Sequence, residues 1–198
     1  PGIGQAMKLL RIATFCAALS IGGAAPVLAD GRPVYQQLTD TITEVITRMQ
    51  RDGTAVAIAD LRAEAAGGDP EAILRLGYLH RFLPNPEQKK SGCNYIEQAA
   101  ELGSVQGAHA AGECYANGLV ESQDQAANVL KWFTRAMEGG SNLSRCALGE
   151  HYMRGRLFEK DFDKGFKLCM IAAEAGVPAA MATVGEEYIR GENQPRDM

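Results

Sequence analysis

The sequence predicts an all-α protein, a right-handed α/α solenoid of stacked antiparallel helical hairpins. Three observations predict this fold class. Two series of glycines recur with the same spacings of 35, 37 and 36 residues, a histidine or tyrosine stands three residues after each glycine of the second series, and apolar residues around them repeat with helical period. No stretch alternates apolar and polar residues as a half-buried strand does.

The first 29 residues have the features of a secretory signal peptide. Lys8 and Arg11 lead into the apolar residues 12–21, and residues 27–29 form a small-x-small cleavage site. The apolar stretch is shorter than the roughly 20 residues that a membrane-spanning helix needs. We therefore expect cleavage after Ala29 and a periplasmic or secreted protein, with residues 1–6 lying upstream of the natural start. A cytoplasmic adaptor whose N-terminus is not a leader is the alternative.

The charge of the expected mature chain excludes two classes of partner. Removing residues 1–29 leaves 18 basic and 24 acidic residues, a net charge of −6. Nucleic acids and anionic membranes attract clustered Lys and Arg, and the longest basic cluster here is Lys89-Lys90. We expect no nucleic-acid partner, and no stable membrane span once the leader is removed.

Residues 30–67 are predicted to form an N-terminal capping hairpin. Apolar residues from Val34 to Met49 recur on one face of a helix, and Asp52-Gly53 interrupts that pattern. Thr54 is the expected N-cap of a second helix over residues 55–66. This pair would cover the N-terminal end of the solenoid.

Residues 68–198 contain the repeat, with units at about 68–103, 104–140, 141–176 and a partial unit at 177–198. The first glycine series follows alanine-rich stretches and suits the left-handed residue that ends a helix. The second series lies inside helices, where glycine costs about 1 kcal/mol relative to alanine, so its recurrence indicates close helix–helix approach. The first series is Gly68, Gly103, Gly140 and Gly176, and the second is Gly77, Gly112, Gly149 and Gly185, followed by His80, Tyr115, Tyr152 and Tyr188.

The four cysteines beyond the leader are expected to form two disulfides, as is typical of an exported protein. Facing residues of an antiparallel hairpin have a constant index sum, which pairs Cys93 with Cys114 across the predicted turn and Cys146 with Cys169 across the predicted loop. Cys114 and Cys146 differ in register by five residues, about 7.5 Å of rise, against a tolerated Cα separation of at most about 6.8 Å. Four buried free thiols of a cytoplasmic protein are the alternative.

The third unit carries a recognisable order of residues, namely Leu148, Gly149, Tyr152, Gly155, Asp161 and Lys164, then Ala172, Ala173, Glu174 and Gly176. It resembles the Sel1-like repeat (SLR) family, relatives of the tetratricopeptide repeats, over about residues 66–198. The resemblance implies an α/α solenoid that binds other proteins, such as regulators of envelope signalling, assembly adaptors or secreted proteins that engage host factors. Cysteine-rich secreted members usually have one disulfide in each repeat, whereas the first bridge predicted here crosses between repeats.

No catalytic motif is present in the sequence. It lacks a P-loop, an H-E-x-x-H zinc site, an EF-hand loop, C-x-x-C and S-x-x-K, so we expect no enzyme, no cofactor and no metal. His80 and Trp132 are interpreted as packing residues, and His151 as facing outward. A cell-wall or β-lactam-related enzyme, suggested by analogy with some cysteine-rich relatives, is the alternative.

The expected function is therefore a binding scaffold for a protein or peptide. Stacked hairpins form a concave groove lined by the first helix of each repeat. Candidate groove residues lie beside the packing positions of these helices. They are His109, Glu113, Glu150, His151, Arg154, Glu186, Glu187 and Arg190.

The cysteine pairing predicts the result of a thiol titration. Mature protein that is denatured without reductant is expected to have no reactive thiol, because all four remaining cysteines are bonded. Each bridge closes a loop of about 20 residues, so reduction is expected to lower the free energy of unfolding by roughly 3 kcal/mol per bridge. Four reactive thiols before reduction would contradict the pairing.

Overall fold

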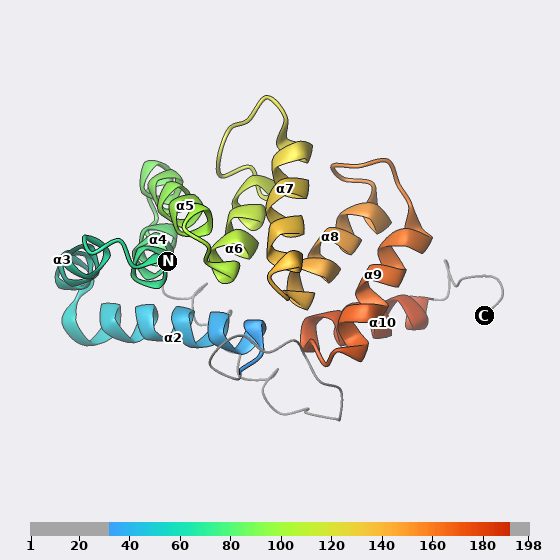
Figure 1. Ribbon diagram of the computed structural model, residues 1–198, viewed down its shortest axis with the longest axis horizontal. Coiled ribbons are helices and arrows are strands. Elements are labelled where there is room, and N and C mark those ends of the chain that lie inside the picture. The colour runs from blue at the N-terminus through green and yellow to red at the C-terminus, as the bar shows by residue number, and fades with distance from the viewer. Residues whose placement is uncertain (1–31, 191–198) are drawn as a thin grey trace.

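The helices follow one another as neighbours in sequence order. The computed structural model describes residues 32–190, and in this range nine helices form an all-α solenoid (Figure 1), as predicted. The leader at 1–29 and the end of the partial fourth unit lie outside the described residues. The helices are α2 (Val34–Asp52), α3 (Thr54–Ala65), α4 (Pro70–Phe82), α5 (Pro86–Glu101), α6 (Val105–Ala116), α7 (Gln125–Glu138), α8 (Asn142–Arg154), α9 (Phe162–Glu174) and α10 (Pro178–Arg190).

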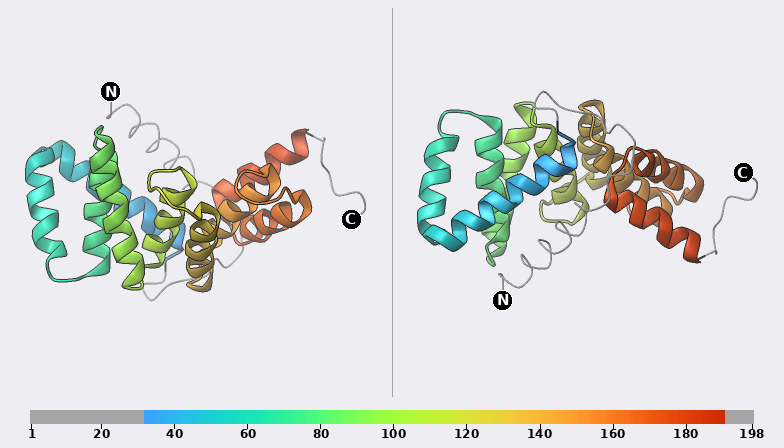
Figure 2. Two further views of the ribbon diagram at one scale, coloured as in Figure 1. Left: turned by 90° about the horizontal axis from the view of Figure 1, so that it is seen from above. Right: turned by 90° about the horizontal axis from the view of Figure 1, so that it is seen from below.

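Helices α4/α5, α6/α7 and α8/α9 form the hairpins, and α10 packs on α9. We call α4, α6, α8 and α10 the first helices and α5, α7 and α9 the second helices (Figure 2). None of the helices between residues 32 and 190 combines the length and the apolar character that a bilayer span requires.

Polar side chains define where most of the helices begin. Ser104 Oγ accepts from Gly107 N at 2.9 Å, and Asp161 Oδ1 accepts from Lys164 N at 3.0 Å. Asp161 therefore has a structural role as the N-cap of α9. The prediction that Thr54 is the N-cap of α3 is wrong, because Thr54 is the first residue of the helix. The N-cap is Gly53, which has no side chain that could form a capping hydrogen bond.

The two glycine series have the two conformations that were predicted. Gly68, Gly103, Gly140 and Gly176 have φ between 78° and 100° and end their helical segments. In the second series, a Cβ at Gly149 would lie 2.5 Å from Gly165 O on α9. Gly185 differs, because a Cβ there would have no atom within 4 Å. Close helix–helix approach therefore explains why glycine occurs at Gly149, inside a hairpin, but does not explain Gly185 on α10.

The core runs without a break from α2 to α8. Trp132 and Phe133 on α7 are fully buried at its centre, so the packing role predicted for Trp132 is confirmed. Lys131 Nζ lies 4.0 Å from the centroid of the Trp132 ring, where a cation–π interaction stabilises the outer edge of the core. A second, smaller cluster joins α8, α9 and α10.

Two disulfides connect adjacent antiparallel helices. Cys93–Cys114 joins α5 to α6 with a Cα separation of 5.9 Å, and Cys146–Cys169 joins α8 to α9 with a separation of 4.1 Å. These are the two pairs expected from the index sums. The first bridge therefore connects two repeats, and the second lies within one.

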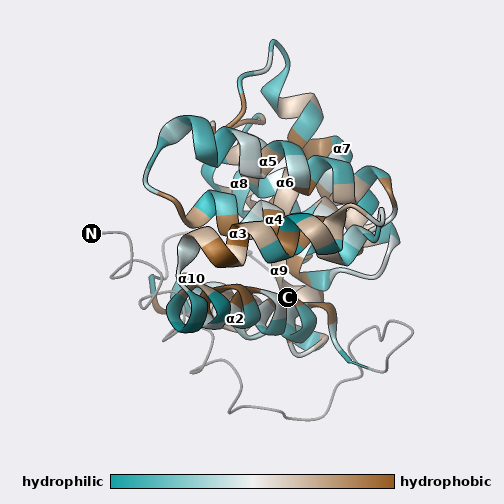
Figure 3. Cartoon of the chain, turned by 90° about the vertical axis from the view of Figure 1, so that its left-hand side faces the viewer, coloured by the Kyte–Doolittle hydropathy of each residue, from teal (hydrophilic) through white to brown (hydrophobic). Residues whose placement is uncertain are grey.

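Helix α2 has a different orientation from the hairpins. α3 lies beside α4 at the N-terminal end, where a cap was expected, whereas α2 crosses the stack and contacts α4, α6 and α8 (Figures 1 and 2). In Figure 3, seen from the end of the stack, α2 lies on the same side as α10. The N-terminal segment thus covers part of the face formed by the first helices, in addition to one end.

A matched pair of substitutions tests the glycine at the hairpin contact. Gly149→Ala is expected to lower the free energy of unfolding by about 1–3 kcal/mol, because the added methyl group meets the backbone of α9. Gly185→Ala has open space and a helical backbone, and is expected to raise it by up to about 1 kcal/mol. Urea unfolding followed by circular dichroism measures both, and equal effects would contradict this account.

Candidate binding groove

Polar contacts join each first helix to the next. Each links two side chains 33 to 35 residues apart in sequence, so the contact is made between successive repeats. The pairs are Ser104 Oγ to Glu71 Oε1 at 2.7 Å, His109 Nδ1 to Ser144 Oγ at 3.0 Å, and Thr183 Oγ1 to Glu150 Oε1 at 2.9 Å. These bonds fix the spacing of the first helices, and two of them end on predicted groove residues.

Helix α2 is held on this face by a buried hydrogen-bonded chain. Thr41 Oγ1 donates to Gln106 Oε1 on α6 at 3.2 Å, and Gln106 Nε2 donates to Gln37 Oε1 at 3.1 Å. All three side chains are buried. Leu38 and Val45 pack beside them in the main core. α2 therefore covers the end of α6 where Gln106 lies and leaves the following turns of that helix uncovered.

An open cavity of about 390 Å³ lies beyond α2, between α6 and α8. Five of the eight predicted groove residues line it, which brings together side chains from two repeats. The lining residues are His109, Glu113, Ala116 and Asn117 near α6, Leu143, Cys146, Ala147, Glu150, His151 and Arg154 on α8, and Arg156 and Ala179.

The other three predicted residues do not line this cavity. Glu186, Glu187 and Arg190 lie on α10 and pair with one another, with Arg190 Nη1 2.9 Å from Glu187 Oε1 and Arg190 Nη2 3.6 Å from Glu186 Oε2. Their spacing of three and four residues places them on one helix face, so they form a local cluster. The structure does not bring them to the other five.

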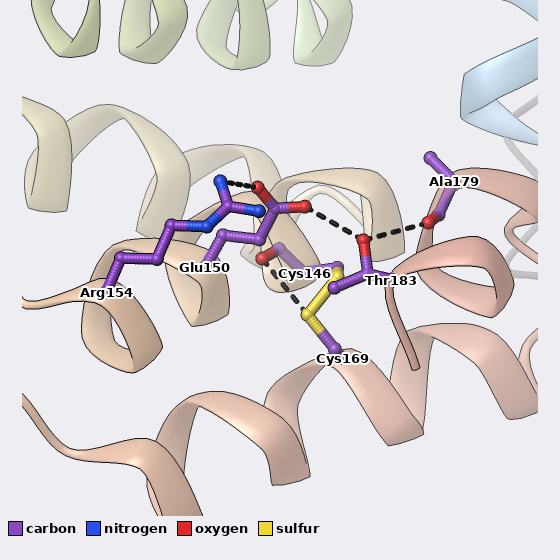
Figure 4. The surroundings of a disulfide bond; sticks show 6 residues. All are labelled: Cys146, Glu150, Arg154, Cys169, Ala179 and Thr183. Atoms are coloured by element: carbon purple, nitrogen blue, oxygen red, sulfur yellow. Dashed lines mark hydrogen bonds and ion pairs between the residues drawn. A yellow bond between two sulfur atoms is a disulfide. The ribbon is translucent and has the colours of Figure 1, made fainter. Parts of the chain in front are cut away.

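One wall of the cavity is braced by a disulfide and by Glu150 (Figure 4). Cys146 lines the cavity and is bonded to Cys169 on α9, which anchors α8. Glu150 accepts from Arg154 Nη1 at 2.7 Å and from Thr183 Oγ1 at 2.9 Å. Glu150 therefore links α8 to α10, and its negative charge is compensated by Arg154.

The opposite wall presents His109 and Glu113, one helical turn apart on α6. His109 is buried, with 7% of its surface exposed, and its ring lies 5.8 Å from that of Phe133. Burial lowers the pKa of His109, so the ring is neutral at pH 7. Glu113 is partly exposed and accepts from Asn117 Nδ2 at 3.2 Å, and it has no ion pair with another described residue.

The prediction that His151 faces outward is wrong. His151 is half-buried, its ring lies 6.3 Å from Phe133 and 6.5 Å from Phe158, and burial lowers its pKa. Phe133 of α7 and Phe158 of the loop after α8 pack against the His151 ring. The sequence pattern did not reveal this contact between elements. His80 packs as predicted, 5.4 Å from Tyr95 and with neither ring nitrogen hydrogen-bonded.

Sequence reasoning missed the remaining lining residues for two reasons. Asn117 lies one turn after Glu113, so helical periodicity could have identified it. Arg156 lies in the loop after α8, where no periodicity applies. Leu143 and Ala147 are apolar, whereas the candidate groove residues were all polar, so neither was among them.

The chain is similar to known proteins that contain Sel1-like repeats. The chain is 31% identical over 147 residues to the chitin synthase regulator SKT5 of Saccharomyces cerevisiae, an alignment that covers 73% of this chain and 20% of that protein. A crystal structure of a Sel1 repeat protein from Oxalobacter formigenes matches with 27% identity and a TM-score of 0.50, over 57% of this chain and 86% of that one. The chain is a Sel1-like repeat protein. No family model matches it.

A further solved structure supports the Sel1-like fold. A protective antigen present in uropathogenic Escherichia coli strains, which displays an SLR fold, matches with a TM-score of 0.59 and 18% identity. The match covers 97% of this chain and 43% of that one, and at this identity it concerns the fold alone. This Sel1-like chain spans about a fifth of the length of the yeast regulator.

The buried histidines of this Sel1-like repeat protein predict acid sensitivity. Burial lowers the pKa of His80, His109 and His151, so below the unfolded-state value of about 6.5 the unfolded chain binds more protons. The free energy of unfolding is therefore expected to be independent of these groups above that pH and to fall as the pH decreases through it.

A substitution isolates the part due to one ring. His80→Phe replaces the imidazole that has no hydrogen-bond partner and is expected to reduce the loss of Tm between about pH 7.5 and about pH 5. Thermal unfolding of both proteins at the two pH values measures this, and an unchanged difference would show that His80 does not contribute.

Proposed function

We propose that this chain is an exported, non-enzymatic scaffold that binds a protein or peptide partner in the cavity between α6 and α8. The observation that carries the proposal is that charged and polar side chains from two successive repeats line one open cavity on the face of the first helices. A surface assembled from several repeats is the part of a solenoid that suits an extended partner.

The dimensions and chemistry of the cavity favour a side chain of a larger partner. About 390 Å³ is near the lower end of the range for small-molecule sites, and the lining is mainly polar. Glu113, Arg154 and Arg156 offer charges that orient a polar group. Short segments of a protein supply such groups at fixed spacing, which matches a groove built from repeats.

The bonding of the polar residues supports a role in binding over catalysis. His109 is hydrogen-bonded to Ser144, and Glu150 to both Arg154 and Thr183, so these groups hold neighbouring helices together. The name of the yeast relative describes a regulator of chitin synthase, and regulation through a partner is consistent with a scaffold.

The two disulfides support export. Disulfides persist in oxidising compartments and are rare in the cytosol of most organisms. The proposal includes the leader at residues 1–29, the N-terminal cap at 30–67 and the repeats at 68–198. Cell fractionation tests the location, and a reduced protein retained in the cytosol would contradict it.

Blocking the cavity is expected to abolish capture of the partner. Ala179 is exposed at the cavity, so Ala179→Trp places an indole over the opening without changing the core. Immobilised mature wild-type protein is expected to retain a specific partner from an envelope extract, and the variant to retain about tenfold less or none.

The control is Ala127→Trp on α7, where an exposed alanine lies away from the cavity. It is expected to capture the partner as the wild type does. The proposal fails if the wild type retains nothing above background, or if both tryptophan variants capture the partner equally well.

A further inference from the structure

The α6 wall of the cavity presents hydrogen-bond acceptors. Ser144 Oγ lies 2.9 Å from Ser141 Oγ and donates its proton there. The His109 tautomer that fits this arrangement carries its proton on Nδ1, 3.0 Å from Ser144 Oγ. The neutral ring therefore keeps a lone pair on Nε2, which has no hydrogen-bond partner among the described residues. Because the ring lines the cavity and Nδ1 is turned to Ser144, Nε2 is left for a ligand.

Glu113 adds a carboxylate to the same wall. His109 and Glu113 are four residues apart on α6, a spacing that places their Cβ atoms about 5–6 Å apart on one face. Among residues 32–190, the only side-chain partner of the Glu113 carboxylate is the Asn117 amide at 3.2 Å. A carboxylate has room for about four hydrogen bonds, so most of its capacity is unused.

The geometry points to a site for an arginine side chain of the partner, which Glu113 and His109 would bind through its guanidinium group; this inference rests on the proposed function. Guanidinium has five donors in a plane and no acceptor, which complements a carboxylate beside an imidazole lone pair. The planar group also stacks on rings, and the half-buried His151 ring lines the other side.

The two arginines that line the cavity, Arg154 and Arg156, do not neutralise the charge of Glu113. Arg154 is paired with Glu150 at 2.7 Å, so its charge is already compensated. Arg156 is exposed in the loop after α8, where solvent and salt screen its repulsion of an incoming cation. Among the cavity residues, neither Glu113 nor Arg156 has an ion pair with another residue of the described range 32–190, and Glu113 is the one on the α6 wall.

An NMR titration tests the inference with defined probes. The ¹⁵N-labelled mature protein is titrated with the tripeptide acetyl-Gly-Arg-Gly-amide, and with the same peptide carrying Gln or Glu at the centre. The arginine peptide is expected to shift the amide resonances of α6 and α8 around the cavity in a saturable manner. The glutamine peptide is expected to bind at least about tenfold more weakly, because it lacks the charge-assisted hydrogen bonds.

Substitutions assign the effect to one carboxylate. Glu113→Gln keeps the shape and removes the charge, so the Kd for the arginine peptide is expected to rise about tenfold. Glu113→Asp keeps the charge and is expected to retain part of the affinity. Glu121→Gln, on the exposed loop outside the cavity, is the matched control and is expected to leave the Kd unchanged.

The arginine site is overturned by no saturable shift with the arginine peptide, by equal binding of the glutamine peptide, or by an unchanged Kd in Glu113→Gln. Preferential binding of the glutamate peptide would also overturn it and identify an anion site. Capture of the partner from an extract separates the two proposals. A partner retained equally by wild type and Glu113→Gln leaves the scaffold function standing and removes the arginine site, whereas absence of any partner removes the scaffold function itself.

Discussion

The distance between the two helices of a hairpin depends on glycine. At Gly77, Gly112 and Gly149 an added Cβ would lie 2.5 to 2.7 Å from an atom of the following helix. At Gly112 that atom belongs to the Phe133 ring, whereas at Gly149 it is the backbone oxygen of Gly165. In the third hairpin the contact is mutual, because Gly149 on α8 and Gly165 on α9 each face the other's carbonyl oxygen. Each second helix also packs against the first helix of the next unit. Every later feature of the molecule depends on this spacing.

The position of the cavity follows from how the first helices are joined. Their interhelical hydrogen bonds use residues progressively later in the repeat, relative to the recurring glycine, from Glu71 through His109 to Glu150. The contacts therefore move along the helices from one step to the next. α2 covers this face near Gln106, where a buried polar chain replaces apolar packing. The cavity lies on the part of α6 and α8 that α2 does not cover.

Burial gives the groove its electrostatic character. His109 and His151 both pack near Phe133, whose ring is fully buried, and burial lowers the pKa of both imidazoles, so they are neutral at pH 7. A neutral imidazole next to a carboxylate provides acceptors, whereas a protonated one would provide donors and a positive charge. The core aromatic residue of the second repeat thus influences which ligands the cavity can accept.

The sequence by itself determined the repeat, because its signals are local. A positive φ at Gly103 or Gly176 and the cap at Asp161 depend on a few neighbouring residues, and the two cystines followed from counting along antiparallel helices. Only the tertiary structure decided the path of α2 and the position of His151. Nothing in the amphipathic pattern of α2 specifies which face of the stack it covers, since that depends on the turn at Gly53 and on Gln106, about 65 residues away. The same holds for the groove: helical period placed Glu113 and Glu186 on comparable faces, but only the packing of α6 on α8 encloses a cavity.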